Sequence, residues 1–181
     1  MKDIIAARLR EHFRDSVENV TEFREELTVV VRKSDIVEVC RFLRDTDGLK
    51  FDSLRDICGT DRAVTEDRYE VVYNLFSLVN KYRFRIKVKI DESDMHIPSV
   101  TGVWPGADWH ERETYDMFGI AFDGHPDLTR IMMPDDWQGH PLRKDFPVGG
   151  TRSFYFKRDT QPHAGEPPGL IPRIRVQDSD I

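Results

Sequence analysis

The most constraining feature of this 181-residue chain is a strict alternation of apolar and basic residues from Tyr82 to Ile90. A period of two places successive side chains on opposite faces of a β-strand, so the run predicts a strand with one apolar and one cationic face. The preceding run, Tyr69–Leu78, is rich in β-branched and aromatic residues, and Asn80-Lys81 offers a turn between the two. Together they predict a hairpin that must bury one face against other elements.

The cationic face of this hairpin has two interpretations. Its members are Arg83, Arg85, Lys87 and Lys89. Such a row can dock an acidic partner, but charged residues on one face of a strand more commonly form the solvated face of a sheet. We expect the solvated face and keep the docking surface as the alternative.

Two amphipathic helices are predicted before the hairpin, because apolar residues recur there at helical spacing. The first apolar set is Ile4, Ile5, Leu9 and Phe13, and the second is Ile36, Val39, Cys40 and Leu43. Ser34 and Asp35 offer an N-cap for the second helix, and Gly48 stands just past its end.

Two further strands complete the first half of the chain. Leu27–Val31 is a short apolar, β-branched run, and Leu54 and Ile57 belong to another strand that stops near Gly59. Helices combined with a meander of strands predict an α+β fold. We expect a two-layer domain with helices packed on one face of a mostly antiparallel sheet.

Composition excludes several classes of protein. No apolar run approaches the roughly 18 residues of a membrane-spanning helix, and the opening residues lack the apolar stretch of a signal peptide, so we expect the chain to stay in the cytoplasm. Cys40 and Cys58 are too few to ligate an iron–sulfur cluster and are expected to be inert core thiols. A net charge of −6 and a pI near 5.5 argue against nucleic-acid binding.

The second half of the chain contains most of the structure-breaking residues. All ten prolines lie beyond residue 97, and nine of the eleven glycines lie beyond residue 101. From Pro105 to Asp136 there are eight acidic and two basic residues, whereas the next stretch, to Arg158, is mainly basic. These segments can pair within the domain or meet complementary partners. The aromatic residues from Trp104 to Phe146 need a surface to pack against, so we expect a loop-rich half that is nevertheless folded.

A third helix is predicted from Trp109 through Phe118, with Gly119 at its end. Four residues in or near it could hold a metal ion, as in a stand-alone metal-dependent hydrolase. They are His110, Glu113, Asp116 and His125. Their spacing matches no established metal-binding pattern, and ion pairs with Arg112 and Arg130, or helix caps, are commoner uses of such residues.

Two runs in this half resemble the signature of one family. They are Glu111–Ile120, continued by Phe122 and His125–Ile131, and Gly139–Pro147. The family is the C subunit of the proton-pumping NADH:quinone oxidoreductase, respiratory complex I, whose mitochondrial counterpart is the 30-kilodalton subunit. The resemblance marks these motif or partner-interface candidates: Glu111, Arg112, Glu113, Tyr115, Asp116, Phe118, Gly119, His125, Pro126, Arg130, Gly139, Pro141, Arg143, Lys144 and Asp145.

The resemblance implies a non-catalytic subunit of the peripheral arm, with no catalytic, cofactor or metal site of its own. FMN, the iron–sulfur clusters and quinone would belong to partner subunits, and the D and B subunits of complex I would be the expected neighbours. The complex would transfer electrons from NADH to quinone, coupled to proton translocation, at the cytoplasmic face of the inner membrane. The chain would reach that membrane only through the complex.

The motifs and the composition together suggest a division of the chain, since no family motif follows Pro147 and the arm is inferred from its proline content alone. Residues 1–147 would form the α+β domain, and residues 148–181 would form an extended, proline-rich arm ordered on partner subunits. The equivalent subunit of an ion-translocating hydrogenase or another quinone-linked complex is the alternative within the same group of assemblies. Its neighbouring genes would differ, since a hydrogenase needs a nickel-ligating large subunit.

Overall fold

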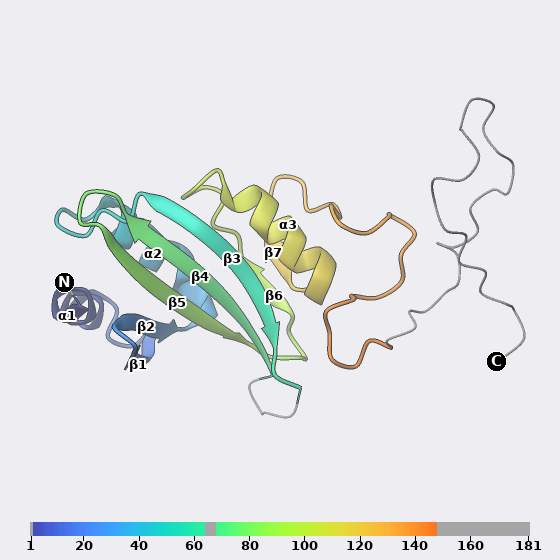
Figure 1. Ribbon diagram of the computed structural model, residues 1–181, viewed down its shortest axis with the longest axis horizontal. Helices are drawn as coiled ribbons and strands as arrows, with labels where there is room; N and C mark the ends of the chain where they lie inside the picture. Colours follow the sequence, from blue (N-terminus) through green and yellow to red (C-terminus); the bar gives the residue numbers. More distant parts are fainter. Residues whose placement is uncertain (1, 64–67, 148–181) are drawn as a thin grey trace, which may run out of the picture. The chain divides into compact units, whose positions relative to one another are not determined.

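The computed structural model describes residues 2–63 and 68–147, so the predicted arm at 148–181 lies outside the described residues. A 3₁₀ turn, Lys33–Asp35, precedes the second helix. The elements, shown in Figure 1, are α1 (Lys2–His12), β1 (Val17–Phe23), β2 (Glu26–Val31), α2 (Ile36–Asp45), β3 (Ser53–Asp61), β4 (Tyr69–Ser77), β5 (Tyr82–Ile90), β6 (His96–Pro98), α3 (Ala107–Phe118) and β7 (Ala121–Asp123).

Strands β1 to β5 form one mixed sheet in the order β1-β2-β5-β4-β3. Neighbours run antiparallel except for β2 and β5, which are parallel. A parallel pair needs a crossover connection, and the chain between these two strands includes α2. The predicted hairpin is confirmed as β4 and β5, and the predicted α+β fold with a mostly antiparallel sheet is confirmed with it.

One face of the sheet is covered by helices and carries the core. The apolar face predicted for α2 is fully buried there, together with Ile5 and Leu9 of α1. Alternate residues of the hairpin, such as Tyr73 and Ile86, pack in the same cluster, as the period of two predicts. Ile4, which is predicted to belong to the apolar face of α1, lies outside this core and is 50% exposed. Its neighbour Ile5 is buried, and adjacent residues on a helix point in different directions.

Two local features before β3 differ from the sequence prediction. Strand β1 is not predicted, because it pairs only with β2 at the edge of the sheet and its mostly exposed, polar residues show no apolar pattern. Asp35 occupies the N-cap of α2 but makes no capping hydrogen bond. Its carboxylate instead accepts a hydrogen bond from Ser16, which ties the start of α2 to the segment before β1.

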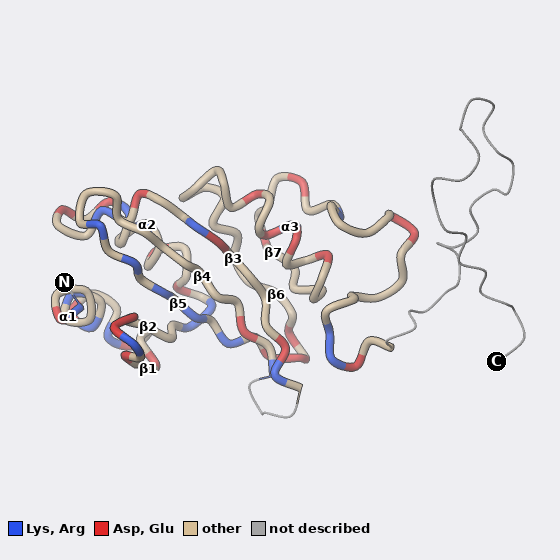
Figure 2. Tube along the Cα trace, in the orientation of Figure 1, with Lys and Arg blue, Asp and Glu red and all other residues tan. Residues whose placement is uncertain are grey.

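The cationic row of β5 is partly neutralised by the neighbouring strands. Arg85 forms an ion pair of 2.6 Å with Glu26 of β2, and Lys87 forms one of 2.9 Å with Glu70 of β4. Figure 2 shows the basic residues along β5 and the acidic residues around them. This pairing within the sheet supports the solvated face for the middle of the row.

The proline-rich half closes the core. The buried indole of Trp104 donates a hydrogen bond of 3.2 Å from Nε1 to the backbone oxygen of Phe51. Helix α3 lies against β3 (Figure 1), where a Cβ at Gly59 would come within 2.6 Å of the Phe118 ring. Gly59 therefore permits the close approach of helix and strand. The predicted end of α3 is confirmed, with Gly119 in the left-handed conformation.

Candidate functional site

Helix α3 carries a buried carboxylate, Asp116, that fixes the following loop in place. Its Oδ1 accepts a hydrogen bond of 2.7 Å from Arg130 Nη1. Its Oδ2 accepts hydrogen bonds of 3.1, 2.8 and 2.9 Å from the successive backbone N–H groups of Ile131, Met132 and Met133. We call Asp116, Arg130 and these three N–H groups the Asp116 cluster.

The electrostatics of the Asp116 cluster favour the ionised carboxylate. Burial alone would raise the pKa of Asp116, but its hydrogen bonds from the backbone and from Arg130 outweigh burial and lower the pKa. Arg130 also donates to the backbone oxygen of Gly139 at 3.3 Å from Nη1 and 3.2 Å from Nη2. One guanidinium therefore joins α3 to two separate points of the loop, and the predicted ion pairing of Arg130 is confirmed.

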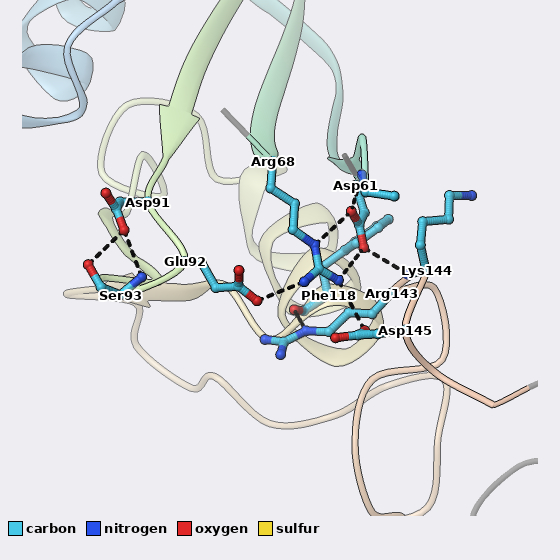
Figure 3. Close-up of polar contacts among 10 residues, drawn as sticks. Asp61, Arg68, Asp91, Glu92, Ser93, Phe118, Arg143, Lys144 and Asp145 are labelled. Carbon is cyan, nitrogen blue, oxygen red and sulfur yellow. Dashed lines mark hydrogen bonds and ion pairs between the residues drawn. The ribbon is translucent and has the colours of Figure 1, made fainter. Parts of the chain in front are cut away.

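A second buried carboxylate, Asp61 at the end of β3, collects a matching set of donors (Figure 3). Arg68 donates to its two oxygens from Nε and Nη2, both at 3.0 Å. The backbone N–H of Lys144, 83 residues further along the chain, donates to Oδ2 at 2.7 Å. Asp145 completes the set through an ion pair of 3.1 Å with Arg68. We call these four residues the Asp61 cluster.

The Asp61 cluster holds its carboxylate strongly in the ionised form. The two hydrogen bonds from Arg68 lower the pKa of Asp61 far below its ordinary value, and the N–H groups of Lys144 and Ala63 reinforce the effect against burial. Because these donors belong to separate segments, the carboxylate connects the sheet edge to the run that begins at Gly139.

Gly119 lets the loop approach the end of α3 closely. Its φ is 75°, and a Cβ there would lie 2.5 Å from His140 Nε2 and 2.6 Å from Arg143 Nη2. Arg143 donates from Nε to the backbone oxygen of Phe118 at 2.6 Å and places its guanidinium 5.5 Å from the centre of the Tyr69 ring. Arg143 therefore satisfies a carbonyl at the end of the helix. Both sequence motifs meet at this point.

Glu111 is directed into its own domain. Its carboxylate is fully buried and accepts hydrogen bonds of 2.7 Å from Ser99 Oγ and from the backbone N–H of Val100. Burial raises the pKa of Glu111, although these two hydrogen bonds partly oppose that shift. This residue holds the segment before α3 against the helix.

We expect Glu111→Gln to be more stable than the wild type at pH 8, because it removes a charge whose burial is unfavourable. A raised carboxyl pKa contributes stability below the unfolded pKa that is lost as pH rises through the folded value. Glutamine removes the buried charge and can still accept from Val100. Urea unfolding experiments should show that this gain in the free energy of unfolding vanishes near pH 4. The control Glu113→Gln replaces an exposed carboxylate and should leave the free energy of unfolding unchanged at both pH values. A variant that is much less stable at pH 8 would contradict this account.

The remaining helix residues also brace the loop. Arg112 donates to the backbone oxygen and to Oγ1 of Thr129, at 3.1 and 2.9 Å. Tyr115 meets the ring of His140 edge-on at 6.1 Å. The buried ring of His125 accepts a hydrogen bond at Nδ1 from the backbone N–H of Asp127, so its proton is on Nε2.

The metal-site hypothesis finds no support in this geometry. His110 faces Asp56 of β3 at 3.4 Å, and His125 Nε2 lies 3.1 Å from Asp108 Oδ1. Asp116 is occupied by Arg130, and Glu113 is exposed. Within residues 2–63 and 68–147, no three His, Cys, Asp or Glu side chains converge as a metal site.

The cysteines have raised pKa values. Burial raises the pKa of Cys40 well above its ordinary value, and burial with nearby Asp56 raises that of Cys58 to about 11. A raised pKa keeps a thiol protonated and weakly nucleophilic, which agrees with the prediction of inert thiols. Cys40 is fully buried as expected, whereas Cys58 is only half-buried because it lies on the sheet face away from the core.

The surface of this region combines exposed motif residues with apolar side chains. Glu113, Pro126 and the Lys144 side chain face solvent, and Pro141 is half-buried. Trp109, Met132 and Leu142 are 64%, 62% and 51% exposed. No sequence pattern marks Met132, Leu142 or Arg68, because the exposure of the first two and the ion pairs of the third depend on how distant segments pack.

These features define a class of protein: a small α+β domain whose polar motifs fix a long loop onto a helix and a sheet edge. Residues 29–152 match the family described as the 30 kDa subunit of respiratory-chain NADH dehydrogenase. The C subunit of NADH-quinone oxidoreductase from Roseiflexus sp. (strain RS-1) is 51% identical over 156 residues, 86% of this chain and 90% of that protein. The chain belongs to this family, and the resemblance in its motifs is confirmed.

A second relative and two solved structures are also similar to this chain. The C subunit of the same enzyme from Geotalea uraniireducens (strain Rf4) is 48% identical over 158 residues, covering 87% of this chain and 91% of that protein. A trypsin-resistant fragment of Nqo5 superposes with a TM-score of 0.58 at 32% identity, covering 68% of this chain and 99% of the fragment. A chain of the archaeal membrane-bound sulfane sulfur reductase shares the fold, with a TM-score of 0.69 at 24% identity over 81% of this chain and 85% of that one.

None of the helices within residues 2–63 and 68–147 is long and apolar enough to cross a membrane.

Proposed function

We propose that the chain is a non-catalytic structural subunit of the peripheral arm of NADH:quinone oxidoreductase, where it holds together the D subunit, which contains the quinone site, and the cluster-bearing B subunit. The observation that carries this proposal is that the motif residues make their contacts within the domain itself. Asp116, Arg130 and Arg143 all make hydrogen bonds that fix one loop to α3. A segment fixed in advance loses less entropy when a partner binds.

The surface that would meet these partners is the exposed side of α3 and its loop. Large apolar side chains exposed on a rigid frame are typical of protein contacts, and aromatic residues are often their strongest members. We propose Trp109, Met132 and Leu142 as the apolar part of this interface, with Glu113 and Lys144 as charged residues at its rim.

In this proposal the chain binds no cofactor. FMN, the iron–sulfur clusters and quinone belong to partner subunits, which carry electrons from NADH to quinone with coupled proton translocation. The chain sits at the cytoplasmic face of the inner membrane and reaches it only through the complex. The names of the relatives favour this complex over the hydrogenase alternative, and sequencing the neighbouring genes separates the two.

The test is recovery of partner subunits with a tagged chain from gently solubilised native membranes. We expect the wild type to bring down the other peripheral-arm subunits, and Met132→Glu with Leu142→Glu to lower their yield more than about tenfold, as loss of central apolar contacts does. The control Ile4→Glu changes an exposed apolar residue of α1 and should leave the yield unchanged. Recovery of free wild-type monomer, or full recovery with the double variant, would refute the proposal.

A further inference from the structure

A groove of about 310 Å³ opens at one end of the sheet. Its polar lining comes from β2, β3, β4 and β5 and comprises three guanidinium groups, two carboxylates and one amide. These residues are Arg55, Arg83, Arg85, Glu26, Asp56 and Asn74. The lining therefore carries a net positive charge, although the whole chain is acidic.

Only one of the three arginines is neutralised inside the groove. Arg85 donates from Nη2 to Glu26 at 2.6 Å and from Nε to Asn74 at 3.2 Å. Arg55 and Arg83 are both exposed, and neither forms an ion pair with a carboxylate of residues 2–63 or 68–147. Asp56 is turned toward His110, at 3.4 Å. Two guanidinium groups thus face the same groove without a described counter-ion.

An aromatic ring lies between these two arginines. Phe76 of β4 is the cross-strand partner of Arg83 on β5, and the Arg55 guanidinium lies 5.5 Å from the centre of its ring. The register of β3 shifts between Leu54 and Asp56, so Arg55 occupies an irregularity of the strand. Bulges of this kind redirect a side chain. Here Arg55 is directed toward the Phe76 ring, and the contact with the ring face limits the orientations of its guanidinium.

The tip of the same hairpin adds a fixed apolar surface. Leu78 and Val79 are 60% and 75% exposed. The turn around them is anchored, since the Leu78 N–H donates to Asp52 Oδ1 and the Asn80 side chain donates from Nδ2 to Leu49 O at 2.8 Å. Side chains that are exposed on a backbone held in this way can contact a partner without a large ordering cost.

We propose that this groove binds an acidic segment of another subunit of the complex, an inference that rests on the proposed function. A carboxylate of that segment is held by Arg55 and Arg83, and an adjoining aliphatic side chain packs on Phe76 and Leu78. Guanidinium groups bind carboxylates through paired, charge-assisted hydrogen bonds, which gives the site its preference for Asp or Glu. The end of the cationic row is therefore a docking surface, while its middle is neutralised within the sheet.

The first experiment places a benzophenone amino acid at position 76 in the tagged chain and illuminates the complex purified from native membranes. Mass spectrometry then identifies the attached peptide. We expect a segment of another subunit with an Asp or Glu next to an aliphatic residue. Attachment only within this chain, attachment to a segment without acidic residues, or no attachment would overturn the inference.

The second experiment tests the charges. Arg55→Glu with Arg83→Glu should lower the cross-linked yield more than about tenfold, and Arg55→Gln with Arg83→Gln should lower it less, because like charges add repulsion. Arg10→Glu, an exposed charge reversal on α1, is the matched control. Thermal unfolding of each chain verifies folding. An unchanged yield in both double variants overturns the inference, while failure of the wild type to recover any partner would instead refute the proposed function.

Discussion

Replacing Asp116 with alanine is expected to destabilise the chain by about 3–5 kcal/mol, the loss typical of removing one member of a buried ion pair. The substitution leaves Arg130 without its counter-ion and deprives the N–H groups of Ile131, Met132 and Met133 of their acceptor. For a domain of this size the midpoint of thermal unfolding should fall by roughly 10 °C. Circular dichroism during heating and in urea measures both quantities.

Two further variants make this prediction specific. Asp116→Asn keeps one acceptor oxygen without the charge, so it should fall between the wild type and Asp116→Ala. Asp135→Asn removes an exposed carboxylate nearby and should lie within about 0.5 kcal/mol of the wild type, as surface substitutions usually do. An alanine variant as stable as the control would show that the Asp116 cluster does not hold the loop.

The elements that could be predicted from sequence are those whose pattern is local. Strand β5 shows a period of two over its whole length, its partner β4 is rich in β-branched and aromatic residues, and α2 shows four apolar residues on one face, all of them buried. The end of α3 at Gly119 is signalled by the glycine itself. In each case the residues that specify the element lie within it, so a window of the sequence contains the full signal.

The elements that could not be predicted depend on distant residues. Strand β1 has no apolar alternation because it is an edge strand with mostly exposed side chains. Asp61 and Lys144 are 83 positions apart, and nothing in either neighbourhood indicates that they meet. Likewise, Glu111 and Asp116 lie in one motif and both are acidic, yet burial raises the pKa of the first while hydrogen bonds lower that of the second.

A dense run of charged residues suggests either a partner surface or internal support. In this chain Glu111, Asp116 and Arg143 support the domain itself, and Glu113 faces solvent. Buried charged groups with several hydrogen bonds fix one arrangement of the chain. The motif therefore specifies the shape of the loop, and the apolar residues which that loop exposes are the better candidates for partner contact.

The Asp61 cluster should be the second site where one substitution has a large effect. Asp61→Asn is expected to cost about 3 kcal/mol at pH 7, since it leaves the Arg68 guanidinium with a weaker acceptor. Arg68→Met should cost a similar amount, because it leaves a buried carboxylate unpaired. The double variant should lose less than the sum of the two losses, since removing both charges leaves neither unpaired. Losses that simply add would show that the two side chains are not coupled.

The pH dependence provides an independent measurement of the same cluster. The folded pKa of Asp61 is lowered, so its contribution is fully present above the unfolded pKa of about 3.9 and is lost as pH falls toward the folded value. Wild-type stability should therefore decline below about pH 4, and Asp61→Asn should decline less steeply, so that the two curves converge in acid. Urea unfolding between pH 7 and pH 2.5 measures this. Parallel curves would mean that Asp61 is not the carboxylate whose protonation weakens the fold.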